Sequence, residues 1–140
     1  MLVNMKQMLE DAEGAACADI MTYAGEEYFR KAERRALERT AELECAIIST
    51  GGGLPVWGDN QQWMAERGVS VYLKRTPEQI ISRLSPHGRY KRPKLRGLND
   101  EELLRVMQEG IAEREPIYSK ADLVLDGSQM SDYEMVDRLV

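Results

Sequence analysis

Short apolar runs that alternate with longer helical segments limit the folds open to this chain. The runs lie at 45–49, 69–73 and 121–125, and each is rich in Val, Ile or Leu. Strands that alternate with helices predict an α/β domain, in which helices flank a parallel sheet in three layers. The run at 45–49 is continuous rather than alternating, so we expect a strand buried on both faces.

Capping residues set the expected helix boundaries. Asp59, Thr76 and Asp100 are good N-caps, and Gly14 and Gly68 are typical of C-terminal stops. Pro116 is expected to end the helix that it follows. The expected helices span 6–11, 26–43, 59–66, 77–84, 100–113 and 131–140.

Composition excludes several classes of protein. The 140 residues fit one domain, and a net charge of -5 argues against nucleic acid as a general partner. Cys17 and Cys45 have no metal-ligand spacing, so no metal site is expected. No apolar run is long enough for a membrane span, and the first residues lack the pattern of a signal peptide. A cytoplasmic protein is therefore expected.

Three consecutive glycines, Gly51, Gly52 and Gly53, follow the first apolar run. Gly53 and Gly58 have the spacing of the phosphate-loop pattern G-x-x-x-x-G-K-[ST], but Asp59 and Asn60 replace its lysine and hydroxyl. The pattern is therefore absent. The glycines serve either a tight turn with positive φ angles or a ligand that lies against the backbone beyond the strand.

A basic segment at 85–98 carries five cations between Gly88 and Gly97. It is a solvated loop, a nucleic-acid surface with Tyr90 as a stacking residue, or a lid hinged at the two glycines that closes over phosphates. Arg114 stands near the end of a helix, and its planar guanidinium suits carboxylate recognition.

Four motifs in register resemble one family, the shikimate kinases. They are 25–33 (GEEYFRKAE), 49–53 (STGGG), 92–95 (RPKL) and 114–118 (REPIY). The resemblance covers nearly the whole chain. It implies a fold like that of phosphate-loop nucleotide hydrolases, and phosphorylation of the 3-hydroxyl of shikimate by MgATP on the pathway to aromatic amino acids.

The resemblance also implies roles for individual residues. Arg30 and Arg114 would hold the shikimate carboxylate, with Glu33 orienting Arg30. Gly51, Gly52 and Gly53 would approach the hydroxyls, and Phe29 would pack beside the ring. Arg92 would close with the lid and stabilise charge on the transferred phosphoryl group, while Arg83, a looser match, would lie near the adenine.

The family pattern begins with a strand, a phosphate loop and a helix, and none of these is expected here. Asn4 and Lys6 occupy the positions of two acidic residues that serve Mg²⁺ and the substrate hydroxyls in the family. We therefore expect either a kinase homologue that has lost its ATP side, or a relative or gene fragment that binds shikimate without phosphorylating it. The family is monomeric, but this chain is expected to fold poorly or to associate through exposed strand edges.

Overall fold

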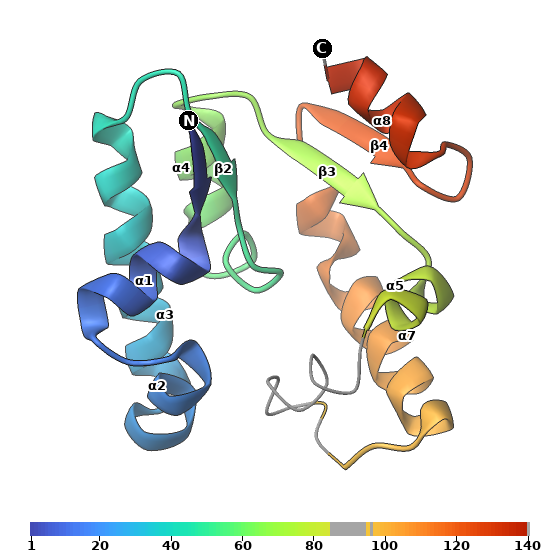
Figure 1. Ribbon diagram of the computed structural model, residues 1–140, viewed down its shortest axis with the longest axis horizontal. Coiled ribbons are helices and arrows are strands. Elements are labelled where there is room, and N and C mark those ends of the chain that lie inside the picture. The colour runs from blue at the N-terminus through green and yellow to red at the C-terminus, as the bar shows by residue number, and fades with distance from the viewer. Residues whose placement is uncertain (85–94, 96, 140) are drawn as a thin grey trace. The chain divides into compact units, whose positions relative to one another are not determined.

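Strands lie between helical segments along the chain, as the sequence predicts. The computed structural model describes residues 1–84, 95 and 97–139, which divide into two units, 1–63 and 64–140 (Figure 1). The first unit contains β1 (Leu2–Asn4), α1 (Met5–Glu13), α2 (Cys17–Ala24), α3 (Glu26–Arg39), the 3-10 turn η1 (Thr40–Glu42) and β2 (Ile47–Ser49). Helix α4 (Asn60–Ala65) begins in the first unit and ends just beyond its boundary.

Helix α3 is the centre of the first unit. Helices α1 and α2 both pack against it, and their buried contact joins Leu9, Ile20, Phe29 and Ala32. The apolar positions of α3 recur at helical spacing, which is why one face of this charged helix is buried. Phe29 is therefore a core residue of this unit, and it fixes the backbone of the neighbouring Arg30.

Helix α2 was not expected from the sequence. Its N-cap, Ala16, offers no side-chain hydrogen bond. The Cys17 amide instead donates to Glu10 Oε2 of α1 at 2.7 Å, so a residue seven positions earlier satisfies the helix start. A capping signal of this non-local kind cannot be read from the residues around Cys17.

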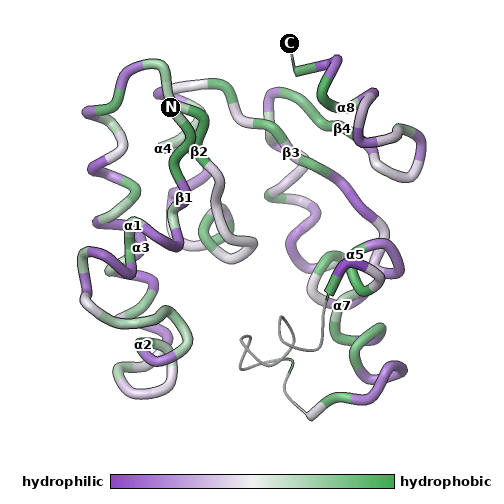
Figure 2. The backbone as a smooth tube through the Cα atoms, viewed as in Figure 1, coloured by the Kyte–Doolittle hydropathy of each residue, from purple (hydrophilic) through white to green (hydrophobic). Residues whose placement is uncertain are grey.

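Strand β2 pairs in parallel with β1, with Leu2 opposite Ile47 and Asn4 opposite Ser49. The expectation that this strand is buried on both faces is wrong. Ile47 is 72% exposed and Ile48 is 37% exposed, and Leu2 on the partner strand is 77% exposed. The continuous apolar run reflects β-branched side chains that suit a strand, rather than burial of that strand. Both strands begin with apolar residues, which are green in Figure 2, and each ends at a polar residue.

The second unit contains β3 (Val71–Lys74), α5 (Pro77–Arg83), α7 (Asp100–Tyr118), β4 (Leu123–Asp126) and α8 (Asp132–Leu139). Strands β3 and β4 form a second parallel pair, with Val71 opposite Leu123. Thr76 and Gln79 cap α5 reciprocally, as the sequence pattern at the start of that helix suggests. The α/β class with parallel strands is thus confirmed, and the strands form two pairs within the described residues.

Helix α7 departs from its expected bounds at both ends. Asn99, not Asp100, is the N-cap, because its side chain accepts a hydrogen bond from the Glu102 amide. The helix then continues through Pro116 to Tyr118. A proline this close to the end costs only one backbone hydrogen bond, and the Ser119 amide still donates to the Glu115 carbonyl. The expected end at Glu113 is therefore wrong.

The segment predicted as a lid, 85–98, lies almost entirely outside the described residues, so its role stays a prediction. The prediction of one domain over 1–140 likewise stays a prediction. Among the helices that the structure describes, none combines the length and the apolar character of a transmembrane span.

Candidate acid-binding site

Arg30 and Glu33 form a half-buried ion pair on α3. Arg30 Nη1 donates to Glu33 Oε1 at 2.9 Å, and the two side chains are 12% and 9% exposed. The spacing of three residues places them on one helix face, so the predicted contact is confirmed. Burial raises the pKa of Glu33, while the hydrogen bond and charge of Arg30 oppose that rise. The arginine is thus held in one orientation by a carboxylate that water reaches poorly.

Phe29 contacts the same guanidinium from the side of the core. The Arg30 Cζ atom lies 5.2 Å from the centroid of the Phe29 ring, within the range of a cation–π contact. Glu26, on the exposed side, is 3.8 Å from Arg30 Nη2. Phe29 and Glu33 therefore restrict Arg30 from two directions, while the Nη2 edge has only a longer contact with an exposed carboxylate.

Gly53 lies directly against the Arg30 guanidinium. A Cβ atom at this position would stand 2.5 Å from Arg30 Nη1 and 2.6 Å from Cζ, well inside van der Waals contact. Arg30 cannot retreat freely, because Glu33 and Phe29 hold it. A side chain at position 53 would therefore have to displace the Arg30 guanidinium or move the backbone away from it.

Gly51 has a different environment, since a Cβ atom there would meet no atom within 4 Å. Neither Gly51 nor Gly53 has a positive φ angle; within the first unit these angles occur at Gly14, Gly25, Gly58 and Cys45. The alternative of a tight left-handed turn does not account for these two glycines. The role of these glycines toward a ligand therefore stays a prediction.

Arg114 is half-buried on α7, and no side-chain hydrogen bond or ion pair to it occurs among the described residues. The next residue, Glu115, is anchored to strand β3. It accepts hydrogen bonds from Tyr72 Oη at 2.8 Å and Lys74 Nζ at 3.0 Å. Tyr118 packs its ring 5.1 Å from that of Tyr72. The last turn of α7 is thus fixed on the strand, and the Arg114 backbone with it.

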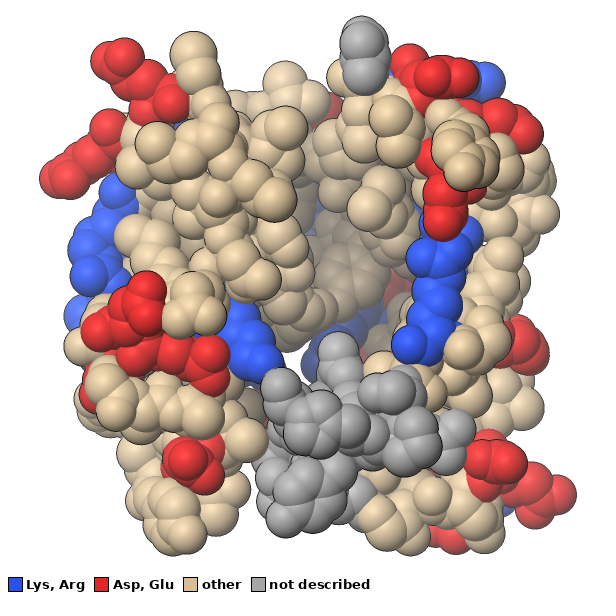
Figure 3. Space-filling view, in the orientation of Figure 1, with Lys and Arg blue, Asp and Glu red and all other residues tan. Residues whose placement is uncertain are grey.

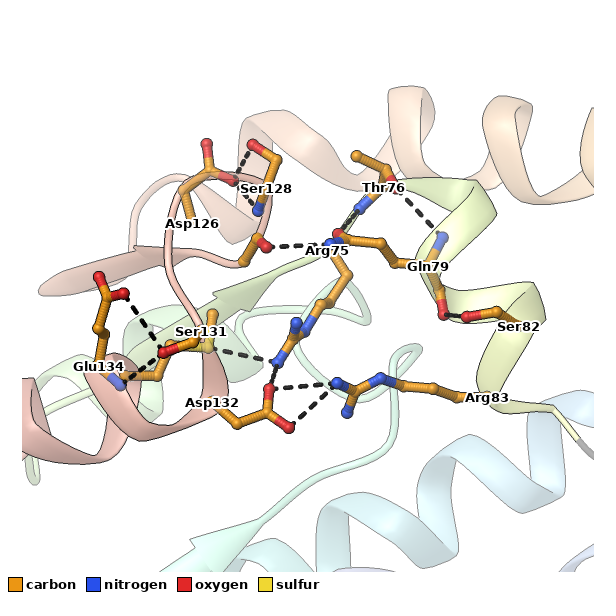
Figure 4. Close-up of polar contacts among 12 residues, drawn as sticks. Arg75, Thr76, Gln79, Ser82, Arg83, Asp126, Ser128, Ser131, Asp132 and Glu134 are labelled. Carbon is orange, nitrogen blue, oxygen red and sulfur yellow. Dashed lines mark hydrogen bonds and ion pairs between the residues drawn. The ribbon is translucent and has the colours of Figure 1, made fainter.

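Arg83 is engaged by a carboxylate in the second unit. Its Nη2 atom lies 3.1 Å from both oxygens of Asp132, which also pairs with Arg75 (Figure 4). The hydrogen bonds from Arg75 and then from Arg83 lower the pKa of Asp132. Gln79 Nε2 reaches the Gly127 carbonyl at 3.0 Å beside them. The structure thus places Arg83 in a network that ties α5 to the β4–α8 loop.

Positions that matter for the predicted phosphate and Mg²⁺ contacts carry residues with other partners. Asp59, at the lysine position of the phosphate-loop spacing, is paired with Arg34. Asn4 and Lys6, at the two acidic positions of the family, have no carboxylate to offer a cation. The Asn4 side chain instead caps α1 by accepting a hydrogen bond from the Lys6 amide at 3.0 Å. No group of three or more metal-ligating side chains occurs in the part of the chain that the structure describes. Arg92, the predicted phosphoryl-stabilising residue, lies outside that part.

Sequence reasoning missed two arrangements near the predicted residues. Arg34, one helical turn after Arg30, binds Asp59 and Asn60. Its spacing of four residues from Arg30 could have indicated that both arginines lie on one face of the helix. Tyr72 and Lys74, which hold Glu115, are far from it in sequence and gave no signal. Basic side chains (blue) and acidic side chains (red) both appear on the face drawn in Figure 3.

Parallel strands between helices, with a guanidinium held against a glycine segment, define an α/β protein suited to a small anionic ligand. Comparison with known proteins is more specific. The family model for shikimate kinase matches residues 1–140, and the chain belongs to the shikimate kinase family.

Relatives and solved structures agree with this assignment. A shikimate kinase from Parabacteroides distasonis is 37% identical over 128 residues, which cover 91% of this chain and 73% of the relative. The crystal structure of shikimate kinase from Bacteroides thetaiotaomicron is 30% identical and superposes with a TM-score of 0.88, covering 99% of this chain and 80% of that one. A shikimate kinase from Acinetobacter baumannii, in complex with shikimate, has the same fold at 22% identity and a TM-score of 0.86, covering 99% and 75%.

Proposed function

We propose that this chain binds shikimate, and that Arg30 and Arg114 recognise its carboxylate. The observation that carries the proposal is the arrangement of Arg30 between Glu33, Phe29 and the Gly53 backbone. An arginine that is already oriented loses little conformational freedom when it binds a carboxylate through two parallel hydrogen bonds. Arg114 supports the proposal because its guanidinium has no side-chain partner among the described residues.

The remaining contacts of the proposal are those that resemblance to the family implies. Gly51, Gly52 and Gly53 approach the ring hydroxyls, and Phe29 supports the site from the apolar side of Arg30. Arg92 stabilises charge on a transferred phosphoryl group, and Arg83 lies near the adenine. The family reaction moves the γ-phosphate of ATP to the 3-hydroxyl of shikimate, with Mg²⁺. Positioning and charge neutralisation dominate such a transfer.

A second candidate is a relative that binds the acid without phosphorylating it. It is favoured by one observation: these 140 residues contain no phosphate-loop pattern, and Asp59 and Asn60 stand where its lysine and hydroxyl would follow Gly58. On this proposal the chain recognises the acceptor substrate and contributes little to the binding of ATP.

Calorimetric titration separates these candidates. We expect shikimate to bind the 140-residue chain, and MgATP to show no micromolar, Mg²⁺-dependent affinity. A coupled assay for phosphorylation of shikimate is then expected to give no signal above the reaction without protein. Absence of shikimate binding would contradict the proposal as a whole. Micromolar binding of MgATP would contradict only the second candidate and would indicate a phosphate site elsewhere in the chain.

A further inference from the structure

Arg34 lies on α3, the helix that also carries Arg30. It binds the end of segment 51–60, the stretch that begins with the three glycines. Its Nη1 atom donates to Asp59 Oδ1 at 2.6 Å and to Asn60 Oδ1 at 2.7 Å. Its Nε atom donates to Glu38 at 2.9 Å, and its guanidinium lies 5.6 Å from the ring centroid of Trp63. Arg30 and Arg34 are four residues apart, so both extend from one face of α3 toward segment 51–60.

Asn60 connects Arg34 to the residue that follows the glycines. It is fully buried, and its Nδ2 atom donates to the Leu54 carbonyl at 2.8 Å. Leu54 is fully buried as well. A continuous path therefore runs from Arg34 through Asn60 to Leu54, and from Leu54 to Gly53, whose backbone contacts Arg30.

We propose that Arg34 and Asn60 are positioning residues for acid recognition, acting through segment 51–60 rather than by touching the ligand. They fix the distance between the glycine backbone and the Arg30 guanidinium, and so determine where a ring bearing hydroxyls fits beside its carboxylate. This inference rests on the proposed binding of shikimate.

The chemistry of the contact supports a positioning role. Removal of the Arg34 guanidinium leaves a fully buried amide oxygen on Asn60 without its donor, which favours rearrangement of the segment. The neighbouring Arg35 has similar chemistry but a different task. It is 56% exposed and pairs with Glu13 of α1 at 3.4 Å, away from segment 51–60. Arg35 therefore offers a control with the same change in charge.

The test compares Arg34→Met, Arg34→Lys and Arg35→Met by calorimetric titration with shikimate. We expect Arg34→Met to weaken binding about tenfold, in line with the loss of a buried charged hydrogen bond. Arg34→Lys should largely restore affinity, because one nitrogen, Nη1, serves both Asp59 and Asn60 and an ammonium can replace it. Arg35→Met should bind as the parent does.

A second ligand distinguishes positioning from a general loss of structure. Cyclohexene-1-carboxylate has the ring and carboxylate of shikimate but none of its hydroxyls. If Arg34 positions the glycine segment, Arg34→Met should weaken shikimate more than this analogue. Equal loss for both ligands would indicate a general structural role and would overturn the inference.

The outcomes separate this inference from the proposed function. If the parent does not bind shikimate, the proposed function fails and this inference fails with it. If the parent binds and Arg34→Met binds equally well, only the positioning role is wrong. Should Arg34→Met not fold, Asp59→Ala is the alternative variant, because the Asp59 side chain is 70% exposed and its removal deletes only one contact of Arg34. It should weaken shikimate about threefold, and unchanged affinity would again overturn the inference.

Discussion

At the scale of single residues, the two arginines differ in how much of their environment is already fixed. Arg30 is held by Glu33 and Phe29, whereas Arg114 has no side-chain partner in the described part of the chain. Under the proposed function, Arg114 would gain a partner on binding the acid, whereas Arg30 already has one.

Replacement of either arginine by lysine tests the geometry of recognition. Arg30→Lys and Arg114→Lys keep the charge but lose the planar pair of donors, so each should weaken shikimate binding by roughly 1 to 3 kcal/mol. Arg105→Lys, at an exposed position of α7, is the control and should leave affinity unchanged. Parental affinity in both lysine variants, measured by calorimetry, would rule out carboxylate recognition by these side chains.

Gly53 and Gly51 provide a matched pair of substitutions. Gly53→Ala places a methyl group against the Arg30 guanidinium, and we expect it to lower the free energy of unfolding by roughly 1 to 3 kcal/mol and to weaken shikimate binding. Gly51→Ala adds a methyl group where no atom lies within 4 Å, so the fold should tolerate it. Thermal unfolding and calorimetry measure both effects. Equal effects from the two alanines would contradict the close approach at Gly53.

At the scale of elements, the attachment of α7 to β3 through Glu115 explains why the helix continues past Pro116. Burial alone would raise the pKa of Glu115, but hydrogen bonds from Tyr72 and Lys74 outweigh it and hold the pKa below the usual 4.5. The same contact raises the pKa of Tyr72, after the larger contribution of burial. The ionised carboxylate is thus the form that the folded chain favours.

This lowered pKa gives a defined dependence of stability on pH. The stability contributed by Glu115 is present above pH 4.5 and is lost as the pH falls through the lower pKa of the folded state. Glu115→Gln should lower the free energy of unfolding by about 1 kcal/mol at neutral pH, and the difference from the parent should shrink in acid.

Denaturant titrations over a range of pH measure that difference. Glu113→Gln removes an exposed carboxylate from the same helix and should have no comparable effect. A difference between parent and Glu115→Gln that stays constant from neutral to acidic pH would show that ionisation of Glu115 is not what fixes the end of α7.

The elements also show what sequence can and cannot predict. Thr76 located the start of α5, whereas Asp100 was one residue off as the cap of α7. The expected pairing of Glu33 with Arg30 joins residues three apart on one helix, and the structure contains it. Helix α2 escaped prediction because Glu10 of another helix caps it. Burial of β2 was overestimated because a continuous apolar run favours a strand but does not show which other elements pack against that strand. The positioning contacts of Arg34 and Glu115 join residues 25 or more positions apart.

At the scale of the whole molecule, exposed apolar strands should govern association. Ile47 and Leu2 face each other in register and are 72% and 77% exposed. Apolar strands of this kind offer unpaired backbone groups and apolar side chains to a second copy. We expect light scattering to show an average mass above that of one chain, rising with concentration.

A lysine substitution on one strand tests which surface is responsible for the association. Ile47→Lys places a cation on the strand and should reduce the average mass. Tyr23→Lys changes a residue that is 87% exposed on a helix and should not. A monomeric parent at high concentration, or equal effects of the two lysines, would contradict association through β1 and β2.

The contact of Arg34 with Trp63 has an optical consequence. The chain contains two tryptophans, and both lie close to the glycines, Trp57 within segment 51–60 and Trp63 three residues after it. The Arg34 guanidinium lies 5.6 Å from the Trp63 ring centroid, so we expect a change in this contact to alter the emission of Trp63. Tryptophan fluorescence of the unlabelled protein should therefore detect changes in the conformation of this segment. Ligand binding beside Arg30 could then be followed without an added label.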